Sequence, residues 1–70
     1  MSSREIVARN LRKFRRAKGL SQEELAHRAD INRNYVGLLE REQNSATTDM
    51  LDKLAEELGV YAGDFFNRKS

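Results

Sequence analysis

The chain has 70 residues, a net charge of +2, no cysteine and a single histidine, His27. This length predicts one domain, residues 1–70, whose core supplies only about 3–5 kcal/mol unless oligomerisation adds to it. The composition excludes a disulfide framework and a zinc finger, and one histidine cannot build a metal site of the usual kind.

The first predicted element is a helix over residues 4–18. Val7, Leu11 and Phe14 recur at helical spacing and form one apolar stripe. Gly19 follows as the residue that ends the helix, because it adopts a left-handed backbone without strain.

The positive charge is concentrated in this first segment. Residues 1–20 hold seven basic residues against one acidic, a net +6, whereas the other fifty hold six against ten, a net −4. This asymmetry is compatible with docking of a polyanion or with an ordinary solvated face. Within it, we interpret the stripe of Arg9, Arg12 and Arg16 as solvated, together with His27 on the next helix.

A second helix is predicted over residues 21–29. Ser21 and Glu24 have the spacing of a capping box, in which each side chain binds a free backbone N–H of the other residue. Leu20 and Leu25 flank this cap at the positions of a hydrophobic staple.

A third helix, over about residues 32–41, is predicted to begin at Asn32 as its N-cap. Ile31 and Val36 are expected to form its staple. Only Asp30 and Ile31 separate it from the last inward position of the second helix. So short a connection forces a steep crossing of the two helices, which is typical of a helix-turn-helix.

The chain is predicted to end with a fourth helix and a short last turn. The helix starts at Thr47 and stops at Gly59, and its buried residues are Leu51, Leu54, Ala55 and Leu58. The turn, about residues 61–66, carries Phe65 and Phe66, which are the candidate dimer interface. We expect one of them in the core and the other at that interface. The fold class is therefore all-α, a compact bundle of four to five short helices.

Residues 11–60 resemble the helix-turn-helix domain of phage lambda repressor and Cro, most strongly in GLSQEELA followed by INRNYVGLLER. The resemblance implies a recognition helix in the major groove of DNA, with base contacts from Arg33, Asn34 and Leu38. It also implies that Gln22 touches a phosphate and braces that helix, and that Arg15 and Glu40 form a structural ion pair.

Two residues depart from the family pattern, since Asp30 and Glu42 stand where the family has glycine. Aspartate tolerates a left-handed backbone better than most residues, so the turn at Asp30 is expected to survive. Glu42 places a negative charge near the expected phosphate backbone, and it leaves open how the third helix ends.

The side chains of the third helix favour DNA recognition on chemical grounds as well. Arg33 offers a planar donor fork for guanine, and Asn34 offers a donor–acceptor pair for adenine. Leu38 could touch a thymine methyl, pack on Tyr35 or stand exposed. Gly37 indicates either close approach of another surface or a tolerant position. The candidate phosphate contacts are Gln22, Asn32, Tyr35, Arg41 and Asn44.

The sequence therefore predicts a DNA-binding transcriptional regulator, a repressor that binds a palindromic operator in double-stranded DNA as a homodimer. The alternative is a protein-interaction module, antitoxin or adaptor with another protein as partner. The inventory lacks any set of residues for catalysis, so we expect no enzyme, no cofactor and no small-molecule ligand. Without a signal peptide or apolar span, a cytoplasmic protein that does not contact membranes is expected.

Overall fold

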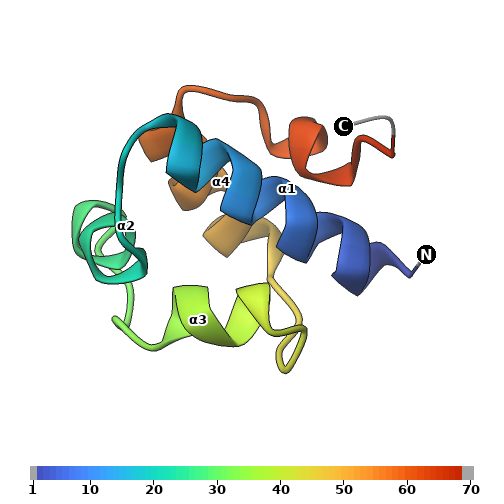
Figure 1. Ribbon diagram of the computed structural model, residues 1–70, viewed down its shortest axis with the longest axis horizontal. Helices are drawn as coiled ribbons and strands as arrows, with labels where there is room; N and C mark the ends of the chain where they lie inside the picture. The colour runs from blue at the N-terminus through green and yellow to red at the C-terminus, as the bar shows by residue number, and fades with distance from the viewer. Residues whose placement is uncertain (1, 69–70) are drawn as a thin grey trace.

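The computed structural model describes residues 2–68 and contains four α-helices and one short 3-10 helix over that range. The elements are α1 (Ser3–Ala17), α2 (Gln22–Arg28), α3 (Tyr35–Glu40), α4 (Thr48–Leu58) and η1 (Ala62–Phe66). Figure 1 shows α1 running through the middle of the molecule, with α2 near its carboxyl-terminal end, α3 below it and η1 above it. The predicted all-α bundle is confirmed.

Side-chain caps fix where three of the helices begin. The Ser21 hydroxyl accepts the Glu24 N–H at 3.0 Å, and the Glu24 carboxylate accepts the Ser21 N–H at 3.0 Å, which confirms the predicted capping box. Thr47 caps α4 through the N–H of Met50 at 3.1 Å, also as predicted. Ser2 forms a second capping box at the start of α1, which the sequence analysis did not identify.

All four α-helices end in the same way. In each one, the residue that follows the left-handed residue donates its N–H to a carbonyl five residues earlier, the bond that defines a Schellman motif. The left-handed residue in these motifs is Gly19, Asp30, Glu42 or Gly59. Asp30 and Glu42, at φ 56° and 62°, thus adopt the backbone of the glycines they replace, so neither departure from the family pattern changes the fold.

The predicted N-cap of α3 is wrong by two residues. α3 begins at Tyr35, and Asn34 occupies its cap position without any side-chain cap bond. Asn32 instead closes a tight turn, because its Oδ1 accepts the Asn34 N–H and its carbonyl accepts the Tyr35 N–H, both at 2.9 Å. Arg33 therefore lies in the turn before α3 and not within the helix.

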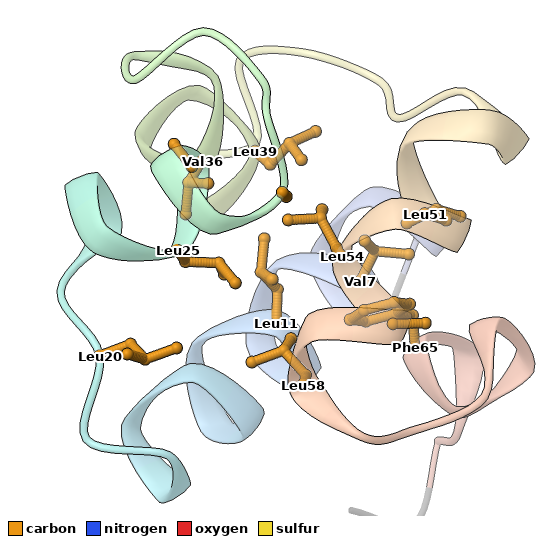
Figure 2. Packing of buried hydrophobic residues seen from close by; sticks show 13 residues of the cluster. Val7, Leu11, Leu20, Leu25, Val36, Leu39, Leu51, Leu54, Leu58 and Phe65 are labelled. Atoms are coloured by element: carbon orange, nitrogen blue, oxygen red, sulfur yellow. The ribbon is translucent and has the colours of Figure 1, made fainter.

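One hydrophobic core joins every helix (Figure 2). Leu11, Leu25, Val36, Leu54 and Phe65 are completely buried at its centre. The Phe65 ring packs against Phe14 with 5.7 Å between the ring centroids. Phe65 cannot take part in a dimer interface, because no part of it reaches the surface; that assignment is corrected here. Phe66 remains 47% exposed, as expected for one of the pair.

Candidate DNA interface

The residues predicted to contact bases lie at the start of the third helix. Arg33 and Asn34 are both exposed in the turn that leads into α3, and Leu38 is half-buried on α3 itself. On the opposite side of α3, Val36, Leu39 and Glu40 are buried, with Glu40 only 3% exposed. The helix thus presents one face to the core and leaves a short polar edge accessible to a ligand.

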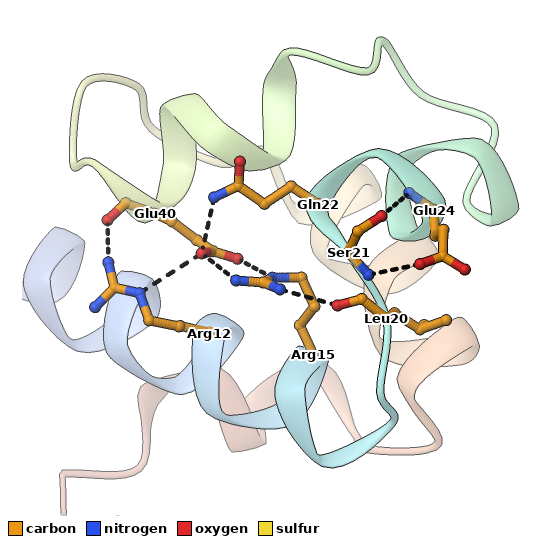
Figure 3. Close-up of polar contacts among 7 residues, drawn as sticks. All are labelled: Arg12, Arg15, Leu20, Ser21, Gln22, Glu24 and Glu40. Carbon is orange, nitrogen blue, oxygen red and sulfur yellow. Dashed lines mark hydrogen bonds and ion pairs between the residues drawn. The ribbon is translucent and has the colours of Figure 1, made fainter.

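The carboxyl-terminal end of α3, at Glu40, is held by an arginine–carboxylate pair (Figure 3). Arg15 of α1 donates from Nε to Oε2 of Glu40 at 2.7 Å and from Nη2 to Oε1 at 2.9 Å. Its third nitrogen, Nη1, donates to the Leu20 carbonyl at 2.9 Å. Such a bidentate contact fixes both distance and angle, so α1, the turn at residue 20 and α3 are held in one arrangement.

The environment of Glu40 keeps its carboxyl group ionised. Burial raises the pKa of Glu40, but the hydrogen bonds from Arg15 and Gln22 and the charges of Arg15 and Arg12 outweigh burial. The net result is a pKa below its ordinary value of 4.5. The hydrogen bond to Glu40 correspondingly raises the pKa of Arg15, so both partners stay charged.

Gln22 braces α3 from the start of α2. Its Nε2 donates to Oε1 of Glu40 at 3.1 Å. A side-chain Cβ at Gly37 would lie 3.1 Å from Oε1 of Gln22 and 3.1 Å from Nη1 of Arg41. The groups that approach Gly37 are thus the flexible side-chain ends of Gln22 and Arg41, which would have to shift by a few tenths of an ångström to accept a Cβ.

Arg12 makes contacts with α3 that the sequence analysis did not predict. It was interpreted as solvated, yet its Nη2 donates to the carbonyl of Glu40 at 2.9 Å and its Nε lies 3.6 Å from Oε1. A signal was present, because Arg12 precedes Arg15 by three residues and therefore lies on the same face of α1.

The loop that follows α3, residues 41–47, is held in place by hydrogen bonds to Ser45. Arg4 of α1 donates to its hydroxyl from Nε at 3.0 Å and from Nη2 at 2.7 Å. The Tyr35 hydroxyl donates to the Ser45 carbonyl at 3.0 Å. This bond is exposed, and the hydroxyl proton can be donated to a phosphate instead, so the predicted phosphate contact of Tyr35 stays a prediction. Arg41 and Asn44 of this loop remain exposed.

Glu42 offers a test of this loop. Glu42→Gly should raise the free energy of unfolding by about 0.5–1 kcal/mol, because glycine removes the Cβ strain of the left-handed backbone. Glu42→Gln retains that strain and should leave stability unchanged. Both changes remove the same charge and should strengthen DNA binding equally. Urea titrations and DNA titrations of the two variants check this, and a destabilising glycine would contradict it.

Residues 11–65 match the family described as Helix-turn-helix. The control protein C.SmaI of Serratia marcescens is 35% identical over 69 residues, which are 99% of this chain and 82% of that protein. The chain belongs to the helix-turn-helix family of transcription regulators. Its resemblance to lambda repressor and Cro is thereby confirmed.

Two further proteins are similar to this chain, one in sequence and one in three-dimensional structure. A hypothetical transcription factor of Neisseria meningitidis serogroup B is 42% identical over 59 residues, 84% of this chain, and the match spans 56% of that relative. The crystal structure of the restriction-modification controller protein C.AhdI from Aeromonas hydrophila matches with a TM-score of 0.85 at 38% identity. That match covers 90% of this chain and 96% of the controller protein.

Other kinds of site are not found in the part of the chain that the structure describes. No helix between residues 2 and 68 is long and apolar enough to cross a bilayer. Over the same range, no three histidine, cysteine, aspartate or glutamate side chains gather into a group that could hold a metal ion.

Proposed function

We propose that the chain is a repressor that binds a palindromic operator in double-stranded DNA as a homodimer, with α3 in the major groove. The observation that carries this proposal is the geometry of the third helix. Its buried face is locked to α1 and α2 through Glu40, while Arg33 and Asn34 are exposed at its start. Helix-turn-helix proteins use the start of this helix to reach base edges.

The residues predicted to contact DNA have the following roles in this proposal. Arg33 binds O6 and N7 of a guanine, Asn34 binds an adenine, and Leu38 touches a thymine methyl group. The phosphate contacts are Gln22, Asn32, Tyr35, Arg41 and Asn44. A regulator of this kind acts in the cytoplasm, on DNA.

Two copies are needed because one short helix reads too few base pairs to select a site in a genome. Phe66 is an exposed aromatic residue that lines a hollow of about 120 Å³. Its other lining residues are apolar ones, Val7, Leu39, Ala46 and Leu51, and polar ones, Ser3, Arg4, Asn44 and Ser45. We place the dimer contact there, with the two recognition helices about 34 Å apart, one turn of DNA.

Phe66→Ser should shift the chain from dimer to monomer and weaken its dimerisation constant by at least about tenfold, because an interface aromatic is lost. Its fold should survive, since Phe66 lies outside the buried core. The matched control is Tyr61→Ser, which removes the other exposed aromatic, 84% exposed, and should leave dimerisation unchanged. Sedimentation over a range of concentrations measures both. A parent chain that is monomeric and binds DNA one copy per site contradicts the dimer.

The alternative partner is another protein. It is favoured by an open hollow of about 680 Å³ between α2 and the turn before α3, lined in part by Glu23, Glu24 and His27. Titration of random duplex DNA at two salt concentrations separates the two functions. A DNA-binding protein should bind weakly and lose affinity steeply as salt rises. An adaptor should bind little at either concentration, and that result would contradict the proposed function.

A further inference from the structure

The carboxyl-terminal end of α3 depends on a side chain from another helix. α3 has only six residues, too few to be stable by itself, so contacts from outside must set its orientation. Backbone N–H groups just beyond the helix bind three of its last four carbonyls, those of Gly37, Leu38 and Leu39. The fourth, the carbonyl of Glu40, accepts Nη2 of Arg12 at 2.9 Å.

The same guanidinium also lies beside the Glu40 carboxylate. Nε of Arg12 is 3.6 Å from Oε1, which is also hydrogen-bonded to Arg15 and Gln22. Figure 3 shows Arg12 reaching the backbone and the side chain of Glu40 from one side, with Arg15 approaching the carboxylate from the next turn of α1. A positive donor also suits this position, because the end of a helix carries partial negative charge.

Arg15 and Arg12 contact different parts of the carboxyl-terminal end of α3. Arg15 has 11% of its side chain exposed and holds the buried carboxylate, whose removal would endanger the whole fold. The Arg12 side chain is 41% exposed and holds the main chain of α3 at its last residue. Losing Arg12 would therefore free the end of α3 to move while the buried pair stays in place.

We propose that Arg12 is a positioning residue for DNA recognition. It fixes the end of α3 and thereby sets the angle at which α3, and the turn that carries Arg33, meet the bases. Arg12 itself does not touch DNA. This inference rests on the proposed function, in which α3 enters the major groove. Its consequence is a residue that controls sequence discrimination without contributing a phosphate contact.

The test compares Arg12→Ala with Arg16→Ala, which removes the same charge from the exposed face of α1 one turn later. Both are titrated on the duplex that the parent chain selects from a random library, called the operator, and on scrambled DNA, over a series of salt concentrations. Relative to Arg16→Ala, Arg12→Ala should lose a further factor of about 3 to 30 in operator affinity. Its affinity for scrambled DNA and its salt slope should equal those of the control.

Two outcomes of the comparison between Arg12→Ala and Arg16→Ala overturn the inference. A salt slope smaller than that of Arg16→Ala, by about one ion per protomer, makes Arg12 a phosphate contact. If Arg12→Ala loses the same factor of affinity on the operator and on scrambled DNA, Arg12 contributes only unspecific electrostatic attraction. If Arg12→Ala does not fold, Arg12→Lys takes its place, because one ammonium group cannot reach carbonyl and carboxylate together. Arg12→Lys should bind the operator with less preference over scrambled DNA than the parent chain does. If its preference equals that of the parent chain, the inference is overturned. A folded parent chain that selects no operator contradicts the proposed function itself.

Discussion

Glu40→Ala should lower the free energy of unfolding by about 3–5 kcal/mol, because it leaves the guanidinium of Arg15 without its buried partner. This loss is as large as the whole stability expected of so small a core, so the variant should be largely unfolded at 25 °C. Circular dichroism and urea titration measure it. The matched control is Glu23→Ala on the exposed side of α2, which should change stability by less than about 0.5 kcal/mol.

Glu40→Gln keeps the shape of the side chain but removes its charge. The contribution of that charge can be measured from how the free energy of unfolding depends on pH. The folded-state pKa of Glu40 lies below its ordinary value of 4.5, so its ionised form stabilises the fold. That contribution is complete above the unfolded-state pKa and is lost as pH falls through the folded-state pKa. The stability difference between parent and Glu40→Gln should therefore shrink as pH falls below about 4.3. A difference independent of pH would show that the carboxylate is not paired.

Arg33→Ala should weaken operator binding by about 1–3 kcal/mol and relax preference at one base pair in each half-site. Arg33 is exposed in the turn before α3, where its guanidinium is free to reach a guanine. Binding to scrambled DNA should change far less, because base contacts contribute little there. Titration of both duplexes at matched salt measures the two effects.

Arg41→Ala and Arg28→Ala provide the comparison. Arg41 lies past the end of α3, and its loss should weaken all duplexes about equally and reduce the salt slope by about one ion per protomer. Arg28 is exposed at the carboxyl-terminal end of α2, and Arg28→Ala should change the affinity for either duplex little. If Arg33→Ala weakens scrambled DNA as much as the operator, Arg33 is a phosphate contact, and specificity has to come from Asn34, Leu38 or DNA shape.

The helix boundaries that sequence could predict are those set by local side-chain chemistry. Ser21 and Thr47 bind N–H groups three residues ahead, so their effect can be recognised from a few neighbouring letters. The start of α3 could not be predicted in this way. Asn32 has two local options, a helix cap or a tight turn, and the choice between them depends on how α3 packs on the core.

Contacts between distant segments were predictable only where the residue type left few choices. A glutamate on the inner face of α3 needs a cation, and Arg15 was the candidate beside the apolar stripe of α1. Arg12 had no such requirement, since an arginine on a helix surface is stable in water. Likewise, two adjacent phenylalanines allowed one to be buried, but only the packing against Phe14 shows that it is Phe65.

Selection of bound duplexes from a random library tests the central claim most directly, because it examines DNA binding, sequence preference and symmetry in one measurement. The account predicts enrichment of two half-sites related by a two-fold axis, with centres about 10 base pairs, or a multiple of that, apart. Enrichment of a single asymmetric site bound by one copy would contradict the homodimer, and no enrichment at all would contradict sequence-specific recognition by α3.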